Sequence, residues 1–148
     1  MGVLLLQNEL PEAASAAALR LARGCERGGP VVVFNPAPAS RPLAESELLL
    51  ADILAPNEVE LALLTGLPTA SDQEVEMAAR RLLFQSDAVS RRHKQPGDGC
   101  RVVLVTLGAR GAMLVAAGST VGSALLLPAA SVAATDTTGY LLLMPMLS

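Results

Sequence analysis

Short apolar runs that alternate with alanine-rich segments constrain the fold of this 148-residue chain more than any other feature. The runs at 3–6, 31–34 and 52–55 are punctuated by prolines and glycines, and the segments between them carry apolar residues at helical spacing. The run at 31–34 is continuously apolar, as in a strand that is covered on both faces of a parallel sheet. The sequence therefore predicts an α/β fold with flanking helices.

Helix end signals refine this prediction. Pro11 suits the first turn of a helix, Asn57 is a typical N-cap, and Ser71 with Glu74 matches a capping box. Gly66 suits a helix end, because glycine tolerates the left-handed conformation found there. The predicted helices run over residues 11–23, 57–66 and 71–84.

The second half of the chain changes character. Residues 85–99 are polar and have no apolar period, which predicts a long, mobile loop. Residues 101–106 are rich in β-branched side chains and predict a strand. An antiparallel hairpin over 112–117 and 123–127 is expected to follow, and then a last strand over 132–135.

Composition excludes several classes of function. With 51% hydrophobic and 17% charged residues, the chain is expected to form one compact soluble domain. The net charge is −3, and the only basic cluster is Arg91, Arg92 and Lys94, so no nucleic-acid partner is expected. No apolar stretch approaches the roughly 20 residues needed to span a bilayer, so no membrane association is expected.

The reactive side chains are sparse. Cys25 and Cys100 are far apart in sequence and match neither a zinc site nor a disulfide framework, which favours a reducing compartment, the cytoplasm or also the nucleus. The pattern Gly-x-x-x-x-Gly-Lys is absent, which excludes a P-loop NTPase. His93 is the only histidine, so imidazole triads and multi-histidine metal sites lack their parts.

Five segments carry a resemblance when they are taken in order. They are Gln7-Asn8-Glu9, Phe34-Asn35-Pro36-Ala37-Pro38-Ala39, Pro56-Asn57-Glu58-Val59-Glu60 with Leu64-Thr65-Gly66, Val105-Thr106-Leu107-Gly108-Ala109-Arg110-Gly111, and Asp136-Thr137-Thr138-Gly139. In this order they resemble the ribokinase-like carbohydrate kinases of the phosphofructokinase-B type. The resemblance implies a partial ribokinase-like, Rossmann-like sheet with a C-terminal β-hairpin region, and an ATP-dependent phosphorylation of ribose to ribose 5-phosphate.

Asn57 and Glu60 stand where a strand passes into a helix. The N–H groups and the dipole of the helix favour anions there, and a carboxylate could help to organise Mg²⁺. A plain N-cap with its N3 glutamate explains the same spacing equally well. The resemblance implies ATP binding by Asn57 and an indirect magnesium role for Glu60.

The segment Thr106-Leu107-Gly108-Ala109-Arg110-Gly111 ends a strand in a glycine turn, which a nucleotide could approach closely. A simple hairpin turn is the alternative. The resemblance implies that all six residues line the ATP site. It also implies that Glu9 contacts the substrate, whereas the residue taken alone fits a surface acid before a helix equally well.

Asp136 and Thr138 match the family's ligands for a monovalent cation, K⁺, and an Asx-type turn is the alternative for them. After Gly139 the family continues Ala-Gly-Asp, and that aspartate deprotonates the sugar hydroxyl. Here the chain reads Tyr140-Leu141-Leu142, so no catalytic residue is assigned.

These observations predict the domain organisation. Residues 1–139 form a partial carbohydrate kinase domain, with 85–99 as an insertion and 140–148 as a tail outside the family pattern. In the family, further segments precede the matched region, and they include the sugar pocket and the lid. These segments are expected to be missing here, which would make this chain an alternative product or a fragment. ATP and a pentose are the expected ligands.

The kinase activity of the family is therefore expected to be lost or crippled in this chain. The alternatives are a non-catalytic nucleotide-binding or regulatory form that associates with the full-length enzyme, and an unstable product without function. A small flavodoxin-like binding module would explain the strands and helices but not the five ordered motifs.

Overall fold

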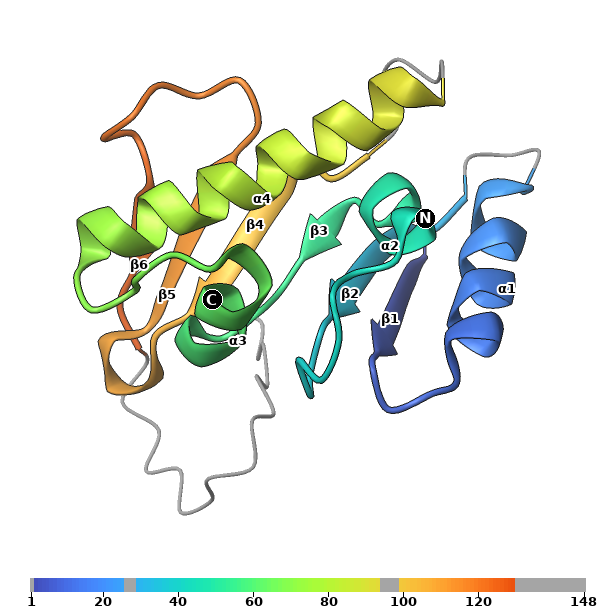
Figure 1. Cartoon of the computed structure of the whole chain (residues 1–148), viewed down its shortest axis with the longest axis horizontal. Helices are drawn as coiled ribbons and strands as arrows, with labels where there is room; N and C mark the ends of the chain where they lie inside the picture. Colours follow the sequence, from blue (N-terminus) through green and yellow to red (C-terminus); the bar gives the residue numbers. More distant parts are fainter. Residues whose placement is uncertain (1, 26–28, 94–98, 130–148) are drawn as a thin grey trace, which may run out of the picture.

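The computed structural model describes residues 2–25, 29–93 and 99–129. Within them the chain forms a mixed α/β unit whose elements follow in the order drawn in Figure 1. The elements are β1 (Val3–Gln7), α1 (Glu12–Arg23), β2 (Val31–Asn35), α2 (Glu45–Leu50), β3 (Ile53–Leu54), α3 (Glu58–Thr65), α4 (Asp72–Arg92), β4 (Val102–Thr106), the 3₁₀ turn η1 (Gly108–Arg110), β5 (Ala112–Ala116) and β6 (Leu125–Leu127).

The six strands form one sheet in the order β1-β2-β3-β4-β5-β6. Strands β1 to β4 are parallel, and β5 and β6 continue the sheet as an antiparallel pair. Parallel neighbours that follow each other in sequence are joined by right-handed crossovers, which place all the intervening helices on the same face. Accordingly α2, α3 and α4 lie in front of the strands in Figure 1, and α1 packs beside α2.

The core lies between the sheet and this layer of helices. Leu6, Phe34, Leu54, Val103 and Val115 align across five neighbouring strands. Each is at most 7% exposed, and they join one apolar cluster with residues of α4. This row fixes the register of the parallel strands, because a slip by one residue would turn every one of these side chains away from the helices.

The opposite face of the sheet is also apolar. Leu5, Val33, Ile53 and Val102 align across β1 to β4 on that face, and Leu5 is 63% exposed. No helix among the described residues covers it. The expectation that residues 31–34 are covered on both faces is therefore met on only one face within the described part of the chain, which explains why Val31 and Val33 are half-buried while Val32 and Phe34 are buried.

The polar segment after Phe84 corrects one prediction. Helix α4 does not end at Phe84 but continues to Arg92, so the predicted loop over 85–99 is wrong for residues 85–92. Ser86, Val89 and Ser90 extend the buried stripe of the helix. Ser86 is buried because its hydroxyl donates to the Leu48 carbonyl at 2.6 Å and accepts from the Cys100 N–H at 2.7 Å.

Helix α2 was not predicted, whereas the other described elements, the end of α4 excepted, follow the prediction within a few residues. The hairpin of β5 and β6 and the caps at Asn57 and Ser71 are confirmed. Pro11, predicted in the first turn of a helix, lies directly before α1 at its N-cap position. The strand expected over 132–135 lies outside the described residues. Among the described helices, none is both long enough and apolar enough to cross a membrane.

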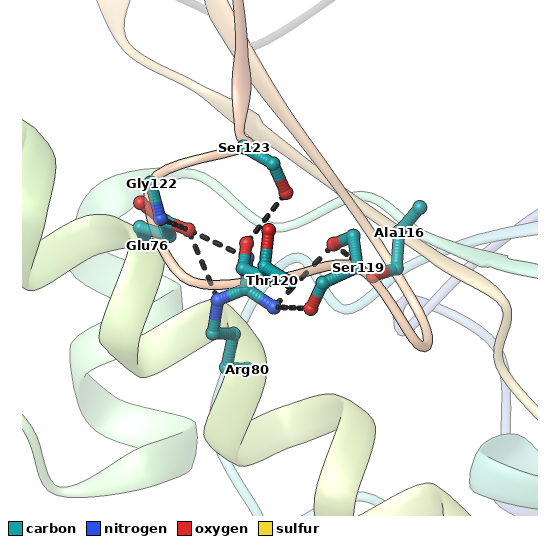
Figure 2. A network of polar contacts seen from close by, with 7 residues as sticks. All are labelled: Glu76, Arg80, Ala116, Ser119, Thr120, Gly122 and Ser123. Atoms are coloured by element: carbon teal, nitrogen blue, oxygen red, sulfur yellow. Dashed lines mark hydrogen bonds and ion pairs between the residues drawn. The ribbon is translucent and has the colours of Figure 1, made fainter.

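A polar network joins α4 to the loop between β5 and β6 (Figure 2). Oε1 of Glu76 accepts from Nε and Nη2 of Arg80 at 3.0 and 2.6 Å and from the Gly122 N–H at 2.8 Å. Arg80 in turn donates to the carbonyls of Ser119, at 2.6 Å, and Thr120. Glu76 is buried, and the network fixes the loop on the helix.

Candidate functional site

The predicted site residues within the described part of the chain lie around one edge of the sheet. Because β1 to β4 are parallel, their carboxyl ends all meet that edge, which is the lower edge in Figure 1. Glu9 follows β1, Asn57 follows β3, and the glycine turn that begins at Thr106 follows β4. In open α/β sheets this edge is the usual place for a ligand.

Asn57 and Glu60 form a reciprocal capping box at the start of α3. Oδ1 of Asn57 accepts from the Glu60 N–H at 2.8 Å, and Oε2 of Glu60 accepts from the Asn57 N–H at 2.9 Å. Glu60 is 9% exposed, whereas Asn57 is exposed. The capping alternative is therefore present in the structure, and it leaves the Asn57 side chain at the surface beside the first turn of the helix.

The helix start and the glycine turn are direct neighbours. Asn57 and Thr106 form an isolated parallel bridge, and the Thr106 N–H donates to the Pro56 carbonyl at 3.0 Å. This pairing extends the ladder between β3 and β4 beyond the strands themselves. It sets the first turn of α3 and the start of the turn at Thr106 side by side.

The glycine turn is closed by its own backbone. The Leu107 N–H donates to the Gly111 carbonyl at 2.8 Å, and the Gly111 N–H donates to the Gly108 carbonyl at 3.1 Å. Leu107 is 3% exposed, so its side chain belongs to the core and only its backbone is available to a ligand.

The two glycines of the turn serve different purposes. Gly111 has φ of 99°, and a Cβ there would lie 1.9 Å from the Leu127 carbonyl oxygen, so close packing against the end of β6 requires glycine. Gly108 has φ of 57°, and a Cβ there would meet nothing within 4 Å. The turn is thus packed at Gly111 and open at Gly108, which leaves room for a ligand at Gly108.

The side chain of Arg110 is engaged by acidic residues of two helices. Its guanidinium forms ion pairs with Glu58 of α3 and Asp72 of α4. Among the residues predicted to line the nucleotide site, it is thus the one whose side chain is already held by carboxylates.

Glu9 lies at the same edge but apart from the other site residues. It is exposed, in the turn after β1. In the sheet β1 is separated from β3 by β2, a distance of about 10 Å at the usual spacing of strands. The structure therefore brings Asn57, Glu60 and the glycine turn together, and places Glu9 two strands away along the same edge.

The loop that carries Glu9 is held by contacts with the loop after β2. The Asn8 N–H donates to the Ala37 carbonyl at 3.1 Å, and Nδ2 of Asn8 donates to the Pro38 carbonyl at 3.0 Å. Nη2 of Arg41 donates to Oδ1 of Asn8 at 2.8 Å. Two of the segments recognised in the sequence are thus joined directly.

Sequence reasoning missed the ion pair behind this loop. Arg41 donates to both carboxylate oxygens of Glu47, at 3.0 and 2.6 Å, and the Ala44 N–H donates to Oε2 of Glu47 at 2.7 Å. Glu47 is 1% exposed, and its hydrogen bonds raise the pKa of Arg41 above its usual value. The spacing from Ala44 to Glu47 is that of half a capping box, which is the one local signal for it.

The described residues contain no cluster of three or more histidine, cysteine or acidic side chains that could hold a metal ion. Glu60 offers one carboxylate near the site. Mg²⁺ commonly keeps several waters and is bound through one or two carboxylates together with substrate phosphates, so a single Glu60 fits such an ion and not a cage made by protein alone. Asp136 and Thr138, the predicted ligands of a monovalent cation, lie outside the described residues.

Comparisons with known proteins agree on a family. The profile of the pfkB family carbohydrate kinases matches residues 2–139. The ribokinase of Arabidopsis thaliana is 33% identical over 138 residues, which cover 93% of this chain and 32% of that protein. The ribokinase of Mus musculus is 35% identical over 137 residues, which cover 93% of this chain and 37% of that protein.

Solved structures give the same result. The structure of Arabidopsis thaliana ribokinase complexed with ribose and ATP matches with a TM-score of 0.59 and 29% identity, over 86% of this chain and 35% of the other. Ribokinase from Thermotoga maritima matches with a TM-score of 0.64 and 29% identity, over 93% of this chain and 38% of the other. The chain thus spans about a third of the length of these relatives.

Proposed function

Because the chain belongs to the pfkB family of carbohydrate kinases, we propose that it forms the nucleotide-binding part of a ribokinase-like fold. The ancestral reaction is the transfer of a phosphoryl group from ATP to a hydroxyl of ribose. This chain binds the nucleotide and does not itself turn over at an appreciable rate.

The observation that carries this proposal is the pairing of Asn57 with Thr106. It sets the N–H groups of a helix start beside an open glycine turn, at the carboxyl edge of a parallel sheet. Helix N-termini and glycine turns in this position suit phosphate groups, because their N–H groups point at the ligand and the helix dipole favours negative charge. The relative solved with ATP and ribose supports the choice of ligands.

The proposal assigns each of these residues a contact with a ligand. The backbone of Gly108 and Ala109 approaches the nucleotide, and Asn57 donates from its amide to a phosphate. Glu60 would help to hold a Mg²⁺ ion, which would supply positive charge to the phosphates. Glu9 meets the sugar, and Asp136 and Thr138 would supply oxygen ligands to a K⁺ ion.

The absence of turnover rests on the residues after Gly139. The family pattern requires Ala-Gly-Asp there, and the chain has Tyr140-Leu141-Leu142. Losing a general base lowers a rate by typically 10²–10⁴-fold, and losing donors that stabilise the developing charge lowers it further. ATP binding depends on other residues, so binding and turnover are separable in this chain.

Calorimetry with a non-hydrolysable ATP analogue and Mg²⁺ tests the binding step. We expect binding, and we expect Gly108→Ala to weaken it by about tenfold, or about 1.4 kcal/mol, because the new methyl group occupies the open side of the turn. Gly118→Ala is the matched control, since Gly118 also has positive φ and open surroundings but lies in the loop between β5 and β6. No binding by the wild-type chain at millimolar analogue would refute the proposal.

A coupled assay of ADP release with ribose tests the second step. The expected rate does not exceed a control without sugar. A clear ribose-dependent rate would show that the chain is a kinase in its own right, and would overturn the absence of turnover while leaving nucleotide binding intact.

A second candidate function is a regulatory form that associates with a full-length kinase. The apolar sheet face that carries Val3 and Leu5, which are 71% and 63% exposed, favours it, because such surface is stabilised by a partner. Sedimentation of the chain mixed with a full-length ribokinase tests it. Two independent boundaries at micromolar concentrations would rule it out.

A further inference from the structure

Arg110 joins three separate parts of the molecule. Its guanidinium leaves η1 and forms ion pairs with Glu58, the first residue of α3, and with Asp72, the first residue of α4. The partners lie 52 and 38 positions away in sequence. Their side chains are 30% and 48% exposed, and that of Arg110 is 44% exposed.

The two ion pairs use the part of Arg110 that a phosphate would need. Nη1 donates to Asp72 and Nη2 donates to Glu58, so both arms of the guanidinium fork already meet carboxylates. A phosphate ligand is usually bound by such a fork through two parallel N–H groups. One positive and two negative charges at this point also make the cluster unattractive to an anion.

Apart from the pairing of Thr106 with Asn57 at its start, the glycine turn is held on the side of the core and of β6. Buried Leu107 anchors its beginning in the core, and Gly111 packs against the end of β6. Gly108 and Ala109 between them are exposed. Arg110 supplies the remaining attachment, toward the helices, and it reaches the residue next to the Asn57 cap.

We propose that Arg110 is a positioning residue for nucleotide binding: its ion pairs with Glu58 and Asp72 hold the glycine turn against the start of α3. It acts through the backbone of Gly108 and Ala109 and does not bind the phosphates. This inference rests on the proposed function and assigns to Arg110 a role other than the ligand role that the family resemblance implied.

Variants on the two sides of the ion pairs distinguish a positioning residue from a phosphate ligand. The double variant Glu58→Gln/Asp72→Asn releases Arg110 but keeps its charge, and Arg110→Gln removes the charge. Exposed ion pairs are individually weak, so we expect both variants to weaken binding of the ATP analogue by only about three- to fivefold. The triple variant should bind no more weakly than either one.

A ligand role predicts the opposite pattern. Release of Arg110 from its carboxylates would leave ATP binding unchanged or strengthen it, and Arg110→Gln would weaken binding of ATP but not of adenosine. A positioning role weakens both ligands by similar factors. Arg110→Lys, which retains one ion pair, should recover part of the affinity, and Asp87→Asn, which removes the exposed ion pair with Arg91 farther along α4, is the control and should change neither.

Amide exchange in the absence of nucleotide tests the attachment itself. The N–H groups of Leu107, Arg110 and Gly111 are hydrogen-bonded within the turn. We expect them to exchange several-fold faster in Glu58→Gln/Asp72→Asn than in Asp87→Asn, at similar urea midpoints. Unchanged exchange would overturn the inference even if ATP binds, whereas faster exchange without any ATP binding by the wild type would overturn the proposed function and leave the attachment standing.

Discussion

The buried ion pair between Arg41 and Glu47 gives the strongest prediction about stability. Glu47 accepts three N–H groups, two from Arg41 and one from Ala44, and is 1% exposed. The substitution Glu47→Gln keeps the shape but exchanges one carboxylate oxygen for an NH₂ group. That group faces donors, so at least one buried hydrogen bond is lost and Arg41 loses its counter-charge.

The magnitude follows from the burial of the two partners. Breaking a buried ion pair by removing one partner costs about 3–5 kcal/mol. Arg41 is 28% exposed, so water partly replaces the lost interaction and the expected cost falls to about 2–3 kcal/mol. The loss should exceed that of most surface substitutions severalfold.

Urea denaturation at neutral pH, followed by circular dichroism, measures this cost. The matched control is Glu12→Gln, because Glu12 also faces Arg41, at 4.0 Å, but is 60% exposed. Its expected effect is below about 0.5 kcal/mol. If Glu47→Gln and Glu12→Gln lowered the free energy of unfolding equally, the argument from burial would be wrong.

Three further predictions concern pH, thiol chemistry and the open sheet face. Hydrogen bonds from the Arg80 guanidinium lower the pKa of Glu76 in the folded chain. The contribution of Glu76 to stability is therefore present above its unfolded pKa and is lost as pH falls through its folded pKa. Glu76→Gln should make the urea midpoint fall less between pH 7 and pH 3 than it does in the wild type, and an equal fall would contradict this. Burial raises the pKa of Cys100 to about 11, so iodoacetamide at pH 8 should alkylate exposed Cys25 and reach Cys100 only after unfolding, as mass spectrometry of the labelled peptides would show. Leu5→Lys should reduce the fluorescence of a bound apolar dye with little loss of stability, whereas Leu6→Ala should cost about 2–5 kcal/mol of unfolding free energy; similar costs would contradict the assignment of faces.

Local signals in the sequence were sufficient for much of the fold. The caps at Asn57 and Ser71 and the glycine at position 66 are read from one or two turns of chain, and the structure confirms each of them. The hairpin of β5 and β6 follows equally from alternating apolar residues around glycines. Such features are decided by neighbours in sequence, so a single sequence is enough to predict them.

Features decided by distant partners were not predictable in the same way. The end of α4 was misplaced because Ser86 looks polar in sequence, yet its hydroxyl is paired with Leu48 and Cys100 in the folded chain. Helix α2 was not predicted, because it has only six residues and one of them, Glu47, is buried through its ion pair with Arg41. In both cases a polar residue takes a core position after finding a tertiary partner, which no pattern of hydrophobicity records.

The candidate site combines the two kinds of information. Its backbone framework, the cap at Asn57 and the turn around Gly108, was recognised from sequence, because both are local. The state of the charged residues was not, since Arg110 is engaged by carboxylates from two helices that lie far from it in the chain. A framework that is locally encoded can bind a nucleotide through backbone N–H groups without depending on any one charged side chain. This is why nucleotide binding in this chain should respond strongly to Gly108→Ala and only modestly to the loss of Arg110.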